Sequence, residues 1–413
     1  MIILLFSNSY PYDYATEQTF LKGEVEILRK QFERVVLVPR IVQGNRLPTP
    51  GGVDVDTSFA ECFTLSKRIL ESALAFFSKD FYLDIKKRLP SSLKPAYLRR
   101  LFSFVAGANL TRKWMQNWLN TNKVSASEVI AYTYWFDEIS MGLGLAKDTL
   151  PLRVVSRAHG YDLYEELYGD WPCRPRAIEL MDGLFSVSEV GSAYLFEKHP
   201  QFREKYETFL LGVPEPQGIS KPSTDNVLRV VSCSMLYDIK RVDLLLDGVV
   251  RAANKRSAQM INWQHFGGRT DECKRFSQRI AVEFPSNANG FFPGFIPQKE
   301  LIQNYIKNPV DVFVNVSSTE GTPVSIMEAI SCGIPVIATA VGGNVEIVRE
   351  KNGFLLGENP TPDEIADALL QVCDDRELWL EKRKGSREVW QQRYNETTNF
   401  EAFAQKLVEI RKR

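Results

Sequence analysis

Long apolar runs, paired cysteines and net charge are all scarce in this chain. No segment reaches the roughly 18 apolar residues of a membrane span, and the apolar start Met1–Phe6 lacks the basic head of a signal peptide. The six cysteines form no C-x-x-C pair and there are only three histidines. This pattern excludes a zinc cluster or disulfide framework as the expected organisation and favours a reducing, cytoplasmic compartment. The formal net charge is +0, so whole-chain charge gives no case for nucleic-acid binding.

The length of 413 residues exceeds what one hydrophobic core usually supports, so we expect two domains. Apolar runs such as Ile2–Phe6 and Val227–Val231 alternate with helical patterns, which is typical of α/β domains with parallel sheets. Between them, residues 211–226 are rich in glycine and proline, as in a linker. The expected domains therefore span 1–212 and 225–395.

The stretch Ser317–Gly343 joins two apolar runs, Val310–Val316 and Ile334–Ala338, that we expect to be buried parallel strands. A turn and a helix should connect them, with Pro323 at the first helical position and Gly333 at a left-handed stop. Ligands collect at such turns in open α/β sheets, and a helix start attracts anions such as a diphosphate. The N–H groups expected to serve this anion site belong to Gly321, Thr322, Val324 and Ser325.

Two carboxylates, Glu320 and Glu328, flank this turn eight positions apart. Glu328 leans back toward the helix start because helical Cα–Cβ bonds tilt that way. Carboxylates repel phosphates, so they suit this site only if they face neutral hydroxyls while the amides hold the phosphates. That division predicts a nucleotide-sugar as the ligand. The alternative is an ordinary βαβ unit whose glutamates are solvated.

With the tail Gly333–Ala338, two glycines and Glu346–Val348, this stretch resembles the E-x7-E signature of the retaining GT-B glycosyltransferases of family four. The resemblance extends over 227–350, where Gly267-Gly268 is similar to the family's second glycine turn and Gly294–Pro297 to the segment beside the base. In the first domain only two segments are similar to the family, Glu17–Phe20 and Arg157–Asp162.

The resemblance implies an α/β fold of the GT-B type, in which two Rossmann-like domains face each other across a cleft. The final helix, 396–413, would pack back on the N-terminal, acceptor-binding domain. The implied enzyme is a hexosyltransferase-type protein that moves a sugar from a UDP- or GDP-linked donor to a saccharide or lipid-linked saccharide. It would retain the anomeric configuration, use no metal or other cofactor, and resemble bacterial enzymes of cell-envelope polysaccharide biosynthesis.

The resemblance also implies residue roles. Glu328 would bind the ribose, Glu320 the donor sugar, and Lys240 the diphosphate together with the turn amides. His159, after the predicted strand Leu152–Ser156, would lie beside the donor sugar and form the catalytic set with Glu320. The remaining nucleotide-binding residues would be Arg241, Gly267, Phe295 and Ile296.

Two departures from the family pattern affect the expected diphosphate site. Met235 stands where the family has an arginine, so one of two cations is missing unless Arg241 or an N-terminal residue substitutes. A missing cation should slow departure of a nucleoside diphosphate, because charge develops there. Pro323 replaces a glycine with a usable N–H.

Two features of the first domain can be interpreted without a functional role. Tyr10, Tyr12 and Tyr14 either shape an acceptor cleft or pack under the first loop, and both alternatives stay open. Asp54-Val55-Asp56 resembles a D-x-D metal pattern only weakly and follows two glycines in an expected loop. We therefore expect no metal site there.

The segment Leu65–Lys113 carries eleven basic and three acidic residues, a local excess of +8, interleaved with leucine and phenylalanine. Amphipathic helices are expected. They either pack on the N-terminal domain with solvated charges or make a peripheral membrane contact at the inner face of the membrane.

Two other functional classes are weighed against a transferase. A retaining glycoside hydrolase would use Glu320 and Glu328 as acid and nucleophile, but it needs no anion-binding turn. A non-catalytic nucleotide-sugar-binding protein would tolerate Met235 and Pro323. Release of a nucleoside diphosphate during turnover distinguishes a transferase from both.

Overall fold

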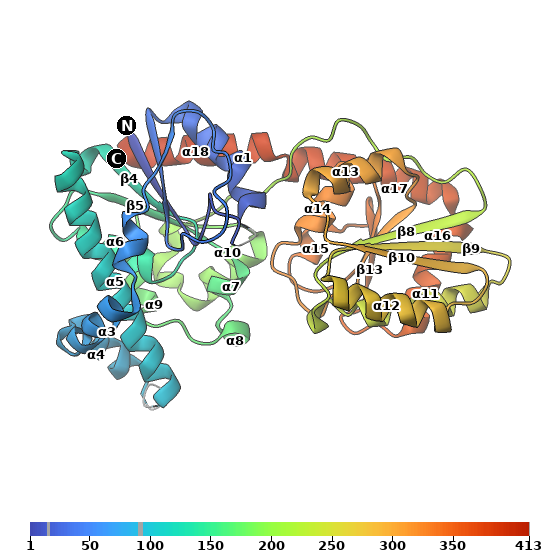
Figure 1. Cartoon of the computed structure of the whole chain (residues 1–413), viewed down its shortest axis with the longest axis horizontal. Helices are drawn as coiled ribbons and strands as arrows, with labels where there is room; N and C mark the ends of the chain where they lie inside the picture. The colour runs from blue at the N-terminus through green and yellow to red at the C-terminus, as the bar shows by residue number, and fades with distance from the viewer. Residues whose placement is uncertain (15–16, 90–93, 413) are drawn as a thin grey trace. The chain divides into compact units, whose positions relative to one another are not determined.

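The computed structural model describes residues 1–14, 17–89 and 94–412 and divides into two compact units. Unit 1 combines Met1–Leu211 with the C-terminal segment Thr397–Arg413, and unit 2 is Gly212–Glu396 (Figure 1). The long red helix α18, Glu396–Lys412, runs beside the blue N-terminal elements of unit 1. Each unit is an α/β layer structure with its own hydrophobic core.

Unit 1 contains a parallel seven-stranded sheet in the order β3-β2-β1-β4-β5-β6-β7. Its strands are β1 Ile2–Ser7, β2 Arg34–Pro39, β3 Val53–Val55, β4 Val129–Thr133, β5 Arg153–Ala158, β6 Gly183–Ser186 and β7 Tyr206–Thr208. Its α-helices besides α18 are α1 Gln18–Gln31, α2 Ser58–Cys62, α3 Leu65–Leu74, α4 Lys79–Lys87, α5 Pro95–Asn122, α6 Glu138–Ala146, α7 Gly160–Leu163, α8 Glu165–Tyr168, α9 Arg174–Leu180 and α10 Glu189–Lys198. The central strands are buried on both faces, as expected for a sheet covered by helices.

Unit 2 contains a parallel six-stranded sheet in the order β10-β9-β8-β11-β12-β13. Its strands are β8 Val227–Cys233, β9 Met260–Phe266, β10 Ala288–Gly294, β11 Val312–Asn315, β12 Val336–Thr339 and β13 Gly353–Leu356. Its α-helices are α11 Val242–Lys255, α12 Thr270–Glu283, α13 Gln298–Lys307, α14 Val324–Ser331, α15 Asn344–Ile347, α16 Pro362–Asp374 and α17 Arg376–Val389.

The strand order reverses in each sheet between its first and fourth strands, β1 and β4 in unit 1 and β8 and β11 in unit 2. Such a reversal parts the loops that leave the carboxyl ends of the two strands, and ligands bind in the resulting crevice. Each unit therefore has one position where a ligand site is expected from topology alone.

Two predictions about local structure need correction. Asp54 lies in strand β3 rather than in a loop, and its carboxylate pairs with Arg34 at 2.7 Å. Asp56 accepts a hydrogen bond from the Trp118 indole at 2.7 Å, so the two aspartates serve separate structural contacts. Pro323 is the N-cap of α14, which begins at Val324, one residue later than predicted.

The predicted basic helices are present as α3, α4 and α5, while residues 90–93 of that segment lie outside the described part. Within the described residues, no helix combines the length and the apolar character needed to cross a bilayer.

Candidate functional site

The two loops at the switch point of unit 2 lie against each other. The loop after β8 contacts the loop after β11 through the Ser318 N–H, which donates to the carbonyl of Ile239 at 2.8 Å. Residues from both predicted motifs, around Lys240 and around Glu320, are therefore brought to one crevice at the carboxyl ends of the strands.

The start of α14 presents unused backbone donors. Within the described chain, the N–H groups of Gly321, Thr322, Val324 and Ser325 donate to no protein acceptor. Ile326 is the first residue of this turn whose N–H is satisfied, by the carbonyl of Pro323 at 3.2 Å. The helix start thus has the free donors and the dipole that an anion site requires.

Two glycines after β12 allow this turn to form. A Cβ on Gly342, which has φ +45°, would lie 1.8 Å from the Glu320 carbonyl oxygen. A Cβ on Gly343 would lie 2.1 Å from the carbonyl oxygen of Gly321, to which the Gly343 N–H also donates at 3.0 Å. Only glycine permits this close approach. The glycine pair therefore lets the backbone of Glu320 and Gly321 pack directly against the loop after β12.

Glu320 and Lys240 form an ion pair, with Nζ 2.6 Å from Oε1. The same oxygen accepts hydrogen bonds from Ser317 Oγ at 2.6 Å and Asn315 Nδ2 at 3.0 Å. Three donors therefore hold one carboxylate oxygen, and among the described residues none donates to Oε2. The arrangement orients Glu320 while leaving one acceptor oxygen for a ligand hydroxyl.

Glu328 is more deeply buried than Glu320 and has a different partner. It is 5% exposed, and its Oε1 accepts a hydrogen bond from Gln298 Nε2 at 2.6 Å. Burial raises the pKa of Glu328 to about 7, against the weaker lowering effect of that hydrogen bond. A ligand that donates hydroxyl hydrogens would favour the ionised form.

The side chain of Arg241 is engaged by backbone carbonyls of neighbouring loops. Its guanidinium donates to the backbone carbonyls of Val316 at 2.6 Å, Ser317 at 2.7 Å and Glu358 at 2.8 Å. These bonds tie three loop segments together at the switch point, so Arg241 positions the site in this structure.

A cavity of about 590 Å³ opens at the carboxyl ends of β9 and β10. Gly268, Phe295 and Met235 line it, whereas Ile296 lines a separate cavity of about 300 Å³ on the other side of β10. Gly267 has φ +112°, and a Cβ there would lie 2.1 Å from the Ser234 carbonyl oxygen, so the glycine turn packs directly on the loop after β8. Two basic side chains missed from the sequence, Arg269 and Lys274, also line the 590 Å³ cavity.

His159 lies in unit 1, directly after β5. Its ring packs on Tyr134 and Trp135, with centroids 4.5 and 4.6 Å apart. Nε2 lies 3.0 Å from the Tyr134 carbonyl oxygen, which can only accept, so Nε2 carries the proton and Nδ1 is the acceptor. Burial, reinforced by the charge of Arg157, lowers the pKa of His159 to about 3 and keeps the ring neutral at pH 7.

A buried carboxylate organises the first loop of unit 1. The buried Glu17 accepts the N–H groups of Asn8 at 2.9 Å, Ser9 at 2.7 Å and Tyr10 at 3.2 Å. Tyr10 is buried and Tyr14 is 57% exposed, so neither alternative for the tyrosines applies to all of them.

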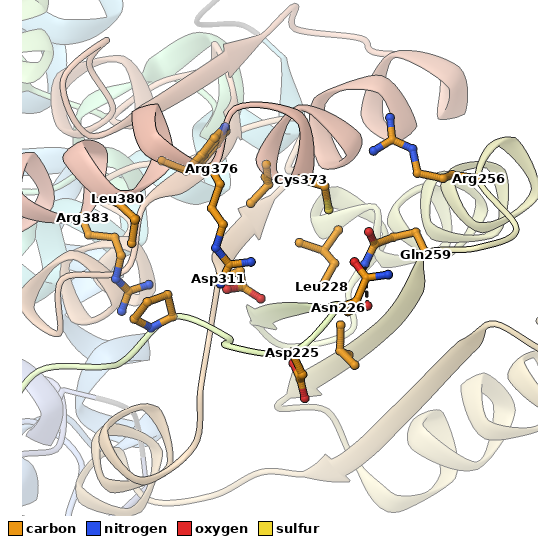
Figure 2. A pocket seen from close by; sticks show the side chains of 14 residues that line it. Asp225, Asn226, Leu228, Arg256, Gln259, Asp311, Cys373, Arg376, Leu380 and Arg383 are labelled. Carbon is orange, nitrogen blue, oxygen red and sulfur yellow. Dashed lines mark hydrogen bonds between the residues drawn. The ribbon is translucent and has the colours of Figure 1, made fainter.

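A further cavity of unit 2, about 240 Å³, lies at the opposite edge of the sheet (Figure 2). Asp225, Asn226 and Asp311 line it, and they immediately precede β8 and β11. It is therefore at the amino ends of the strands, away from Lys240 and Glu320.

Several residues that shape the site were not predicted. Asn315 and Ser317 could have been recognised from the sequence, because they are polar residues at the carboxyl end of an apolar strand. Gln298 and Lys274 could not have been recognised from the sequence, because they come from helices whose position depends on the whole fold.

Solved structures define the class to which this fold belongs. HepE from Anabaena, in complex with UDP and glucose, is 16% identical with a TM-score of 0.63, covering 98% of this chain and 99% of that one. The lipopolysaccharide outer core galactosyltransferase WaaB has 14% identity and a TM-score of 0.66, with 99% of both chains covered. The sucrose-phosphate synthase of Thermosynechococcus elongatus has 14% identity and a TM-score of 0.64, also with 99% of both covered. The fold is that of the GT-B glycosyltransferases, which confirms the predicted fold class.

A family model matches part of the chain, most of it in unit 2. Residues 223–389 match the model of the family "Glycosyl transferases group 1". This segment includes Lys240, Glu320 and Glu328.

Curated relatives match shorter parts of the chain. Sucrose-phosphate synthase 4 of Arabidopsis thaliana is 38% identical over 73 residues, which is 18% of this chain and 7% of that protein. Sucrose synthase of Solanum tuberosum is 26% identical over 244 residues, 52% of this chain and 30% of that protein. The chain thus aligns with a small part of the length of the relatives it matches.

Proposed function

We propose that this protein is a glycosyltransferase that moves a sugar from a nucleotide-sugar to a saccharide or lipid-linked saccharide, retaining the anomeric configuration. The observation that carries the proposal is the pairing, at one switch point, of unused helix-start amides with Lys240 and two carboxylates. UDP is the favoured nucleotide, since HepE is described in complex with UDP and with UDP-glucose.

Each part of the donor has a proposed partner in unit 2. The diphosphate would bind the amides of Gly321–Ser325 and Lys240, and its charge would be met there without a metal or other cofactor. Glu328 would accept hydrogen bonds from the ribose, and Glu320 Oε2 from the sugar. Gly267, Phe295 and Ile296 would border the base. In unit 1, His159 would bind a sugar hydroxyl through Nδ1.

The proposed chemistry rests on charge at the leaving diphosphate. As the glycosidic bond breaks, negative charge grows on the β-phosphate, and preorganised N–H groups stabilise it without rearrangement. Lys240 would exchange part of its ion pair with Glu320 for the phosphate, so donor binding also loosens Glu320 toward the sugar hydroxyls.

Turnover separates this proposal from its two alternatives. The purified chain is incubated with UDP-glucose and an acceptor saccharide mixture, and released UDP and the anomeric proton couplings of the product are measured. UDP release with a retained anomer is expected. Sugar release from plain aryl glycosides without nucleotide would indicate a hydrolase, and UDP-glucose binding without turnover a binding protein.

We also propose that the basic segment contacts an anionic membrane surface that presents the acceptor. Helices α3 and α4 and the short turn between them expose apolar side chains beside lysines 67, 79, 86 and 87. The exposed apolar residues are Leu65, Ile69, Leu70, Leu74, Phe76, Phe77, Tyr82 and Leu83. Apolar side chains flanked by positive charge match the chemistry of an anionic bilayer interface.

A further inference from the structure

Unit 1 has its own cavity at the switch point of its sheet. The cavity is about 740 Å³ and lies between the loops at the carboxyl ends of β1, β2, β4 and β5 on one side and helices α3 and α5 on the other. The strand-end side carries Arg40, Asp137 and Glu138, and the helix side carries Arg68, Arg99 and Arg100. Its volume is that of a site for one or two sugar rings with substituents.

The strand-end charges neutralise one another. Arg40 Nη1 lies 3.0 Å from Glu138 Oε1 and 3.4 Å from Asp137 Oδ2. Burial, with the charge of Glu138 second, raises the pKa of Asp137 to about 7, and burial also raises the pKa of Asp162, which lines the same side, to about 7. Near neutral pH this side therefore carries less negative charge than three fully ionised carboxylates would give it. These groups remain able to donate to and accept from sugar hydroxyls.

The helix side carries positive charge without counter-ions. Among the described residues, no carboxylate lies within ion-pair distance of Arg68, Arg99 or Arg100. Arg68 donates to Ser103 Oγ, and Arg100 stacks over Trp171 with Cζ 4.5 Å from the ring centroid. Stacking and hydrogen bonding fix two guanidinium groups while leaving their charge uncompensated.

Aromatic rings complete the cavity. Trp135 and Trp171 line it, as does Tyr161, whose ring contacts Trp171 at a centroid distance of 6.0 Å. Aromatic faces beside polar groups suit the apolar face of a sugar ring, whereas three uncompensated guanidinium groups would gain nothing from a neutral sugar.

We propose that this cavity binds an acceptor saccharide that carries an anionic group, phosphoryl or carboxylate, held by Arg68, Arg99 and Arg100. The proposal rests on the glycosyltransferase function and adds the chemical class of the acceptor. Guanidinium groups bind either anion through paired N–H donors, so the shared feature is a planar or tetrahedral oxyanion on the sugar. The sugar hydroxyls would face Arg40, Asp137 and Glu138.

Calorimetric titration of the full chain with glucose 6-phosphate, glucuronate and glucose tests the proposal. At least tenfold tighter binding of one anionic sugar than of glucose is expected, and the gain should shrink as sodium chloride rises from 50 to 500 mM. A gain with glucose 6-phosphate only assigns a phosphoryl group, and a gain with glucuronate only assigns a carboxylate.

Two variants on one helix provide the matched comparison. Arg99→Gln removes an exposed cavity charge and should abolish most of the gain, whereas Arg112→Gln removes an exposed charge of α5 outside the cavity and should preserve it. Equal binding of glucose and both anionic sugars, or an equal gain in both variants, would overturn the proposal.

Titration of the unaltered chain with UDP distinguishes failure of the anionic-acceptor proposal from failure of the proposed glycosyltransferase function. UDP binding without discrimination among the three sugars rejects the anionic acceptor alone. Absence of UDP binding rejects the donor assignment, while the sugar comparison still decides the character of the cavity in unit 1.

Discussion

Two glutamates of one motif have different physical states in this protein. Glu320 is held by Lys240, Asn315 and Ser317 through one oxygen, so its side chain is oriented before any ligand arrives. Glu328 is buried against Gln298 alone, and its pKa is raised to about 7 by that burial. The difference fits Glu320 to a fixed hydroxyl contact and makes Glu328 sensitive to pH and to what binds it.

Glu328→Gln should remove a pH dependence from nucleotide binding. Ribose hydroxyls donate to the ionised carboxylate, so UDP affinity of the unaltered chain should rise by about tenfold from pH 6 to pH 8, across a pKa of about 7. The variant should bind UDP about 1–3 kcal/mol more weakly at pH 8 and with little of this dependence. Calorimetry at both values measures it, and comparison of the two proteins cancels the titration of UDP itself.

The pH dependence of folding stability provides a second, independent test of the raised pKa of Glu328. Because burial raises the folded pKa of Glu328 above the unfolded value of 4.5, the folded state holds an extra proton between these values. Stability should therefore fall as pH rises from about 4.5 to 7, and Glu328→Gln should lack this component. Glu381→Gln, at an exposed position of α17, should change neither property. Unchanged UDP affinity in Glu328→Gln would remove the ribose assignment.

Met235→Arg should tighten UDP binding by about 1 kcal/mol, roughly fivefold, because it adds positive charge to the proposed diphosphate site. The matched control is Met260→Arg, the same change at the amino end of β9. Weaker binding by a folded Met235→Arg protein would show that Arg269 or Lys274, which line the same cavity, already supplies the second cation.

At the scale of elements, helices α3 and α4 and the short turn between them contain both a core phenylalanine and exposed ones. Phe81 is 1% exposed and packs on Phe102, with centroids 4.6 Å apart, whereas Phe77 is 86% exposed. Phe81 thus anchors α4 to the core of unit 1, whereas Phe77 contributes nothing to that core. This exposed position lies in the segment 65–113, which carries the local charge excess of +8.

Phe77→Asp should weaken binding to anionic vesicles without affecting folding. Each basic residue near an anionic leaflet contributes about 1 kcal/mol at low salt, and an inserted phenylalanine adds apolar transfer energy. Co-sedimentation with phosphatidylserine-containing and pure phosphatidylcholine vesicles, at 50 and 500 mM salt, measures both contributions. Val282→Asp, an equally exposed apolar position of unit 2 at 85%, is the control and should bind like the unaltered chain. Equal binding to both lipids, or binding to neither, would show that α3, α4 and the turn between them are only a solvated helical surface.

Elements with strong local patterns were predictable from sequence, and the shortest edge strands were not. β4 and β12 are buried throughout and appear in the sequence as continuous apolar runs. β3, β7 and β13 lie at sheet edges, have three or four residues and contain exposed or polar positions, so they lack that signal. The same distinction applies to the site: Glu320, Glu328 and Lys240 lie in a recognisable motif, whereas the partners that tune them come from elsewhere in the fold.

At the scale of the whole molecule, the chain leaves unit 1 and returns to it. Helix α18 supplies Phe403, which is fully buried among the rings of Tyr132, Phe185 and Phe209 at centroid distances of 5.3 to 5.5 Å. Its ring also lies under Arg157, with Cζ 4.0 Å from the centroid, and Arg157 pairs with the buried Glu24 at 3.1 Å. The last residues of the chain therefore complete the core of a domain begun by the first.

Phe403→Ala should destabilise unit 1 by about 3–5 kcal/mol, because it opens a cavity beneath a buried ion pair. Leu369→Ala, in the core of unit 2, is the reciprocal change with an expected cost of about 2–5 kcal/mol.

A two-unit protein need not unfold in one step, and UDP at about 100 times its Kd should add about 2.7 kcal/mol to the stability of the unit that binds it. Calorimetric scans with and without UDP should then show that Phe403→Ala lowers the transition UDP leaves unchanged, while Leu369→Ala lowers the transition UDP raises. If UDP raised the transition lowered by Phe403→Ala and left the other unchanged, the nucleotide would belong to unit 1, and the assignment of the donor to Lys240, Glu320 and Glu328 would be wrong.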